Sequence, residues 1–385
     1  MKLKTKWLIL MILSVLITFS GCQSVLIPED KPLVLDKNSW FSKDTQDDLE
    51  ILSYEDIGNG TVQDISYDGS TLLILNPTQT APVSYNIDLL RYTDQDVRLT
   101  SFLSSEKKEL SASFDPYAQG IFYVDETVGN NGSPSSRELI WTSIDKSNTK
   151  TISSQEENVN PSFCTISDSR VLYTNNNRNI IFADSSGLRQ SYQTTYNLDI
   201  LQIAYLPDAN SVIYTAISPE DENKTNLYRS DIKDDETTLT STLIDENVID
   251  FDLNSNSGIL YYIKTDGGNR KILRCNTNNY TQPSVVAEGN FTSVTSTEES
   301  EKILFSEYST TNSKSSRSIW IMDSDGNNKF QLSAPMTLTS KIIAHPYKST
   351  IYFSAEKGPG SDLSSNNGGP KSNVSTIYKI DYNIK

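Results

Sequence analysis

Hydrophobic and polar residues alternate along most of this chain in short units. One motif recurs, a polar turn followed by three or four aliphatic or aromatic residues, which predicts a short strand. Its seven copies begin at Leu72, Ile121, Val171, Val212, Ile259, Ile303 and Ile351, at intervals of 41 to 50 residues. After residue 21 no segment keeps an apolar 3.6-residue period over 11 or more positions. The pattern therefore predicts an all-β chain of internal repeats.

Each repeat contains three further short strands around this motif. A second apolar strand follows it, as at Ile319-Trp320, and then a polar turn and a shorter strand. Another strand precedes it and ends in a turn, as at Ile65–Gly69. Four-stranded units with this period are typical of propeller blades, which cover one another when stacked around an axis. We count seven blades from about residue 59 to the end, with six or eight as alternatives.

The last repeat lacks its fourth strand. It contains Ile351–Phe353 and Ile377-Tyr378, but few residues follow. The segment Leu49–Tyr54 lies upstream of the first repeat, and we expect it to supply the missing outer strand and close the ring. The alternative is an open ring with a frayed last blade.

The sixth repeat carries the clearest family resemblance. Residues Ser318–Asn328, followed by Phe330–Ser333, resemble the strand, Asp-x-Asp-Gly hairpin and second strand of TolB-like, WD-type propeller repeats. Pieces of the same family's turns recur at Tyr67-Asp68-Gly69 and Leu206-Pro207-Asp208. The resemblance implies a β-propeller, and it implies little about activity because propellers host many functions.

The N-terminal residues have the pattern of an export signal. Three lysines precede an apolar run, Trp7–Phe19, that is too short to cross a bilayer core of roughly 30 Å at about 1.5 Å per residue. Phe19–Cys22 resembles the lipobox of bacterial lipoproteins, which implies cleavage before Cys22 and attachment of lipid chains such as palmitate to it. The alternative is an ordinary signal peptide with a chance cysteine.

These features predict three parts and a location. Residues 1–21 form the signal peptide, 22–48 a lipid-anchored linker and 49–385 the propeller domain. The lipid on Cys22 would hold the chain on the extracytoplasmic face of the cell membrane or the outer membrane. With 33 basic against 49 acidic residues and a formal charge of −16, the chain is a poor partner for nucleic acid.

Candidate catalytic and metal-binding residues are few. His345 is the single histidine, so neither a metal site of several histidines nor a Ser-His-Asp triad is expected, and we interpret it as a turn residue. Asp323–Asn327 looks like the start of a calcium loop, but a strand pattern follows where the closing acid is needed, which favours a hairpin. We interpret Glu220–Glu222 as a solvated loop tip. No cofactor or metal is expected.

The two remaining cysteines are predicted to be buried, unpaired thiols. Cys164 falls in the inner strand of the third blade and Cys275 in the third strand of the fifth. Non-adjacent blades keep their Cα atoms beyond the roughly 7 Å limit for a disulfide.

The longest connections join the second and third strands of a blade, which places them at one end of the ring. They are residues 76–85, 125–137, 218–225, 308–317 and 355–375. Loops gathered at one face of a repeat protein often form its binding face. We therefore expect a non-catalytic module that binds a protein or glycan partner there. The alternatives are a carboxylate-dependent enzyme or accessory protein acting on surface polysaccharide, marked by two acids about 5 to 10 Å apart in the axial funnel, and an envelope-sensing lipoprotein.

Overall fold

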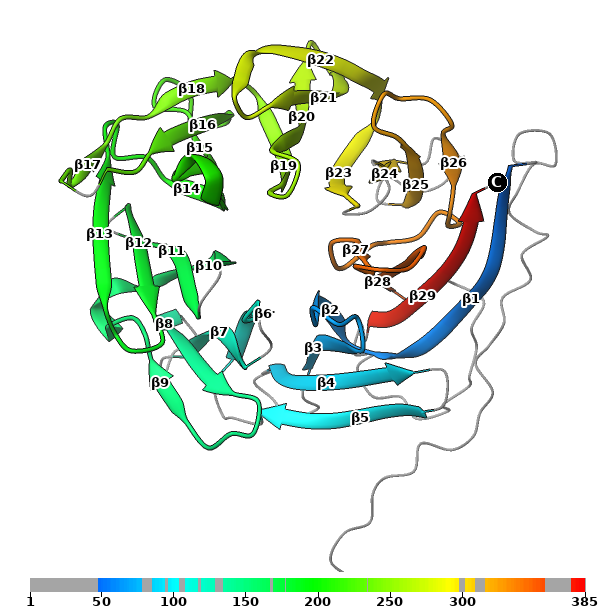
Figure 1. Ribbon diagram of the computed structural model, residues 1–385, viewed down its shortest axis with the longest axis horizontal. Coiled ribbons are helices and arrows are strands. Elements are labelled where there is room, and N and C mark those ends of the chain that lie inside the picture. The colour runs from blue at the N-terminus through cyan, green and yellow to red at the C-terminus, as the bar shows by residue number, and fades with distance from the viewer. Residues whose placement is uncertain are drawn as a thin grey trace, which may run out of the picture. The chain divides into compact units, whose positions relative to one another are not determined.

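The computed structural model describes residues 48–77, 85–93, 96–103, 108–116, 119–128, 134–166, 169–176, 178–233, 235–297, 302–308, 316–356 and 375–384. All of them belong to one compact unit of the chain, residues 34–385. In this part of the chain no helix is long and apolar enough to span a membrane. The strands form seven separate sheets arranged as blades of a ring (Figure 1).

The first six blades follow one another along the chain. Blade 1 contains β2 (Thr61–Ile65), β3 (Thr71–Pro77), β4 (Tyr85–Thr93) and β5 (Asp96–Leu103), and blade 2 contains β6 (Lys108–Phe114), β7 (Gly120–Val128), β8 (Pro134–Ser143) and β9 (Thr149–Thr151). Blade 3 contains β10 (Val159–Ile166), β11 (Arg170–Asn175), β12 (Asn179–Asp184) and β13 (Arg189–Thr194), and blade 4 contains β14 (Ile200–Leu206), β15 (Ser211–Ile217), β16 (Thr225–Asp231) and β18 (Thr242–Asp245). Blade 5 contains β19 (Val248–Asn254), β20 (Ile259–Asp266), β21 (Asn269–Asn276) and β22 (Asn279–Gly289), and blade 6 contains β23 (Phe291–Ser296), β24 (Lys302–Tyr308), β25 (Arg317–Asp323) and β26 (Phe330–Gln331).

Blade 7 is shared between the two ends of the domain. It contains β27 (Ile343–Ala344), β28 (Thr350–Glu356) and β29 (Ser375–Ile384), and its outer strand is β1 (Leu49–Asn59). β1 pairs antiparallel with β29 from Leu49 opposite Ile384 to Asn59 opposite Thr376. The predicted seven blades and the closing strand are thus confirmed, and that strand is longer than the expected Leu49–Tyr54.

The second strand of every blade is buried on both of its faces because each blade lies between two others. Leu172 on β11 packs with Val212 and Tyr214 of blade 4, whereas its neighbours Val171 and Tyr173 pack with Phe122 and Val124 of blade 2. Side chains alternate between the two faces of a strand, so both sets must be apolar. This is why the sequence repeat appears as a run of consecutive apolar residues.

The inner strands share a second repeated feature, a β-bulge near their first residues. The pairing register with the second strand shifts around one extra residue in five blades, at Gln63, Leu110, Leu201, Ile249 and Thr292. A bulge leaves one residue unpaired and redirects its side chain. The bulged residues therefore lie at the end of the ring where the chain enters each inner strand.

Polar side chains join neighbouring inner strands, whose free edges would otherwise leave backbone groups unsatisfied. The Asp64 carboxylate accepts hydrogen bonds from Phe114 N at 2.9 Å and Ser113 Oγ at 2.6 Å on β6. Two amide side chains instead donate hydrogen bonds to the backbone of the next inner strand. Asn160 Nδ2 donates to Ile200 O at 2.8 Å, and Gln202 Nε2 donates to Phe251 O at 2.8 Å. These bonds hold blades together on the inner side of the ring.

Blade 3 departs from the four-strand rule. The segment between β16 and β18 contains β17 (Thr238–Leu239), which pairs in parallel with β13 at Gln193 and Thr194. Part of blade 4 thereby extends the outer edge of blade 3, which the sequence analysis did not predict. Two 3-10 turns, η2 (Gln155–Glu157) and η3 (Pro207–Ala209), complete the described secondary structure.

Candidate functional site

The strand order places all connections between second and third strands at the end of the ring where blades are linked, here called the loop end. Of the five predicted long loops, residues 218–225 are fully described. The other four, 76–85, 125–137, 308–317 and 355–375, lie partly outside the described residues. The boundaries predicted for 125–137 were wrong, because β7 and β8 continue pairing up to Val128 and Pro134. Residues at both ends of the predicted loop are therefore paired strand residues of a β-hairpin.

Among the described residues of the loop end, four large apolar side chains are exposed to solvent. Leu201 and Ile249 are the bulged residues of β14 and β19 in adjacent blades and are 48% and 43% exposed. Tyr196 lies in the link that leads into β14 and is 56% exposed, and Tyr308 ends β24 and is 38% exposed. The Arg270 guanidinium lies 5.6 Å from the Tyr308 ring centre. We call these four side chains the loop-end apolar set.

A row of acidic side chains crosses blade 2 near the same end. Glu109, Asp125 and Glu138 lie directly opposite one another on β6, β7 and β8, and all three are buried. Like charges in directly opposite positions destabilise a sheet. In the next row Glu126 forms ion pairs with Lys108 at 3.7 Å and with Arg137 at 2.8 Å. Of these three acids only Asp125 lies in the predicted loop 125–137, and the strand register that aligns them was not predicted from the sequence.

Two carboxylates on the inner strand β19 have the spacing expected of a catalytic acid pair. Asp250 and Asp252 are two residues apart on β19, roughly 6–7 Å along the strand. Asp250 accepts a hydrogen bond from Val294 N at 2.9 Å and Asp252 accepts one from Ser296 N at 2.8 Å, both on β23. Burial raises the pKa of both carboxyl groups, and these hydrogen bonds offset only part of that effect. Because both already hold blade 6 to blade 5, the geometry gives them a structural role.

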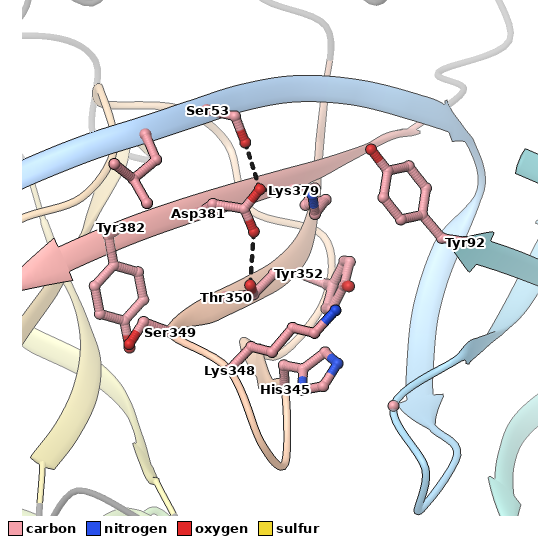
Figure 2. A pocket seen from close by; sticks show the side chains of 12 residues that line it. Ser53, Tyr92, His345, Lys348, Ser349, Thr350, Tyr352, Lys379, Asp381 and Tyr382 are labelled. Carbon is pink, nitrogen blue, oxygen red and sulfur yellow. Dashed lines mark hydrogen bonds and ion pairs between the residues drawn. The ribbon is translucent and has the colours of Figure 1, made fainter. Parts of the chain in front are cut away.

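A pocket of about 410 Å³ lies between blade 7 and blade 1, at the end of the ring opposite the loop end (Figure 2). We call it the closure pocket. β1 contributes Leu52 and Ser53, β29 contributes Lys379, Asp381 and Tyr382, and β28 contributes Thr350 and Tyr352. Blade 1 supplies Gly69 and Tyr92, and the turn between β27 and β28 supplies His345, Lys348 and Ser349. The pocket thus exists only where the ring is closed.

Asp381 is the centre of the polar network in this pocket. Its Oδ2 accepts hydrogen bonds from Ser53 Oγ and Lys379 Nζ, each at 2.6 Å, and its Oδ1 accepts one from Thr350 Oγ1 at 2.6 Å. Burial alone would raise the pKa of Asp381, but these hydrogen bonds and the Lys379 charge hold that pKa below its ordinary value. The carboxylate is therefore ionised and connects β1, β28 and β29.

His345 occupies the turn between β27 and β28, as predicted. Its backbone N donates to Thr350 O at 2.9 Å, and its Nδ1 accepts a hydrogen bond from Tyr347 N at 3.0 Å. That bond places the ring proton on Nε2 in the neutral form. Burial, together with the nearby Lys348, lowers the pKa of His345. The ring lies against Gly69, whose φ is +72°, and a Cβ at Gly69 would lie 2.3 Å from His345 Nε2.

Two exposed tyrosines lie beside the closure pocket. Tyr67 and Tyr347 are 66% and 45% exposed, and their ring centres are 5.8 Å apart in an edge-to-face arrangement. Tyr67 is two residues from Gly69, and Tyr347 lies between His345 and Lys348 in sequence. The pair therefore extends the pocket with an aromatic surface.

Other residues singled out in the sequence have structural roles. Asp323–Asn328 joins β25 to β26 as the predicted hairpin, and Asp325 Oδ1 accepts from Asn327 N at 3.0 Å. At the Glu220–Glu222 tip, Asp221 Oδ1 accepts from Asn223 N at 3.0 Å. Among the residues that the structure describes, no three His, Cys, Asp or Glu side chains are placed to hold a metal ion.

The cysteines lie in the predicted strands. Cys164 is on β10 and Cys275 is on β21, and neither forms a disulfide. Cys275 is buried, whereas Cys164 is partly exposed, so the prediction of a buried thiol was right only for Cys275. Cys22, the predicted lipid attachment site, lies outside the described residues, as do the signal peptide and most of the linker.

No family model and no curated protein matches the chain. Among solved structures, an oligogalacturonate lyase in complex with manganese is 12% identical, with 86% of this chain and 93% of that chain covered and a TM-score of 0.62. The WD40 β-propeller domain of Doa1 is 11% identical, with 86% and 96% covered and a TM-score of 0.53. TolB from Acinetobacter baumannii is 14% identical over 70% and 64%, with a TM-score of 0.48, too low to add to the argument.

These likenesses show the fold alone. The chain is a seven-bladed β-propeller, and the WD40 match agrees with the propeller class expected from the repeats. Its activity has to be argued from its own surface, because propellers of one architecture host unrelated functions.

Proposed function

We propose that the protein is a lipid-anchored, non-catalytic propeller on the extracytoplasmic side of a bacterial membrane, and that it docks a protein partner through the loop end. The observation that carries the proposal is the loop-end apolar set. Leu201 and Ile249 are the bulged residues at equivalent positions of adjacent inner strands, and both leave large apolar side chains exposed to solvent.

The chemistry of this set favours a protein over a glycan. Binding energy at protein interfaces is concentrated in a few central residues, among which tyrosine is enriched, and the surrounding contacts exclude water. Leu201 and Ile249 add exposed aliphatic surface to that of Tyr196 and Tyr308. An aliphatic surface has little to offer the hydroxyl groups of a sugar, so a protein partner is the better match.

The membrane anchor is the other half of the proposal and rests on the sequence around Cys22. Replacing Cys22 with serine removes the thiol that would carry the lipid. We expect Cys22→Ser protein to leave the membrane fraction and to lose radiolabelled palmitate, while wild-type protein retains both. Retention of the label by Cys22→Ser would refute the anchor.

The docking surface can be tested by pull-down from native membranes. The variant is Leu201→Glu with Ile249→Glu, and the control is Leu243→Glu with Val285→Glu, two exposed residues on the outer strands β18 and β22. We expect the first pair to weaken partner binding by about 30-fold or more, equivalent to about 2 kcal/mol. Equal capture by both variants would refute this surface, and capture of glycan in place of protein would refute the partner class.

A further inference from the structure

The closure pocket has the volume of a small-molecule site. Its volume of about 410 Å³ lies within the range of ligand pockets, about 300–1,000 Å³. Polar side chains converge on it from the first strand of the domain, from blade 7 and from blade 1 (Figure 2). A pocket on which a few polar groups converge is the usual first candidate for a ligand-binding site.

The lining offers hydrogen-bond donors. An ammonium group has three donors, and Lys379 uses one toward Asp381 while its Nζ lies 4.6 Å from the Tyr92 ring centre. Lys348 is exposed, and no carboxylate among the described residues forms an ion pair with it. His345 Nε2 carries a further proton, because Nδ1 accepts from Tyr347 N.

The one carboxylate of the lining, by contrast, already accepts hydrogen bonds from the protein. Both oxygens of Asp381, the single carboxylate among the described lining residues, accept hydrogen bonds from the protein. The Tyr92 hydroxyl donates to Glu55 outside the pocket. Two lysines therefore face one neutralised carboxylate, in a chain whose formal charge is −16. Among the lining residues the balance of charge favours an anionic ligand, with Lys348 as the cation that no described carboxylate neutralises, while the carboxylates of Asp68 and Glu55 lie next to the lining.

Tyr67 and Tyr347 add a selective feature beside these cations. Their rings are exposed and meet edge to face. Tyrosine rings give rigid, amphipathic contact surface at small entropic cost. A surface of this kind suits the C–H face of a sugar ring, and a charged substituent on that ring would be recognised by the lysines.

We propose that the closure pocket binds an anionic sugar, a monosaccharide unit with a carboxylate or phosphate substituent, through Lys348, Lys379 and the Tyr67–Tyr347 pair. This site goes beyond the proposed docking function and lies at the opposite end of the ring, so either proposal can fail without the other. The ligand would contact β29, β1 and blade 1 together, and binding would therefore stabilise the closed ring.

The test is calorimetric titration of the full-length protein in detergent with glucuronate, glucose 6-phosphate, glucose and inorganic phosphate. We expect at least one anionic sugar to bind ten times more tightly than glucose and to raise the melting temperature. The tighter of the two identifies the carboxylate or the phosphate as the recognised group. Lys348→Gln should weaken binding of the anionic sugar about tenfold, and Lys146→Gln, in an exposed turn of blade 2, should leave it unchanged.

The aromatic pair has its own variant. Tyr347→Ala should weaken anionic sugar and leave inorganic phosphate unaffected. Glucose binding as tightly as both anionic sugars, Lys348→Gln binding like wild type, or no binding of any sugar at millimolar concentration would overturn the proposal. Inorganic phosphate binding as tightly as glucose 6-phosphate would overturn the assignment of a sugar.

Discussion

Replacing Tyr54 with alanine should loosen the closure of the ring. Tyr54 is 3% exposed on β1, and its ring centre lies 5.6 Å from that of Tyr378 on β29. It belongs to the same apolar cluster as Phe330 and Leu332 of blade 6. Truncation would therefore leave a cavity at the junction of blades 6 and 7.

The expected magnitude follows from the size of the side chain that is lost. Removing a buried aromatic ring costs about 3–5 kcal/mol of unfolding free energy when the surroundings relax only partly. The hydroxyl contact with Met336 Sδ, at 4.0 Å, adds little because a thioether is a weak acceptor. At about 2 °C per kcal/mol for a large domain, the melting temperature should fall by roughly 6–10 °C.

Differential scanning calorimetry of the purified variant measures this shift. Leu52→Ala is the matched control, because Leu52 is on the same strand but 54% exposed, and it should stay within about 0.5 kcal/mol of wild type. If Tyr54→Ala melts within about 2 °C of wild type, β1 does not close blade 7 in solution and the reasoning fails.

Two further predictions concern buried titratable groups. Burial raises the pKa of Asp252 above 3.8, so the folded state favours the protonated carboxyl group, and the stability that this gives is lost as pH rises through the folded pKa. Asp252→Asn should therefore unfold at a higher temperature than wild type at pH 7, and this gain should vanish below pH 3.8. A lower melting temperature of the variant at pH 7 would contradict this. Burial also raises the pKa of the Cys275 thiol to about 11. At pH 8, Cys275 should therefore react with an aromatic disulfide reagent only after the protein is unfolded in urea. Rapid labelling of this cysteine in the native protein would contradict this and would show that the blade opens.

The repeats were predictable because of how the second strands are buried. Neighbouring blades cover both faces of β11 and its equivalents, which forces consecutive apolar residues and makes the period visible. The outer strands leave a weaker signal. Every one of the 11 residues of β22 is exposed or half-buried, so this strand carries no apolar pattern. β17, with two residues, is shorter than any sequence pattern can register.

The closure pocket was harder to foresee. Its residues come from positions 52 to 382 and form no motif. His345 and Gly69 were predicted only as turn residues, and Leu52, Ser53 and Tyr352 only as parts of strands. One signal was present nevertheless. The predicted pairing of residues 49–54 with the last blade already brings Ser53 near the C-terminal strand that carries Lys379 and Asp381. The burial of these side chains and the hydrogen bonds that occupy both oxygens of Asp381 could not be predicted from the sequence, because they depend on strands that are distant along the chain.

The closing strand also sets the order in which the chain can fold. Ser53 and Asp381, which share a hydrogen bond, are 328 residues apart in sequence. Blades 1 to 6 have mostly local pairings and can form as the chain emerges, whereas blade 7 must wait for its final ten residues. Such distant pairing is slow because loop entropy is lost before any contact is gained. Until it forms, β1 presents an unpaired strand edge to other chains. A copy truncated before Ser375 would keep that edge exposed for its whole lifetime.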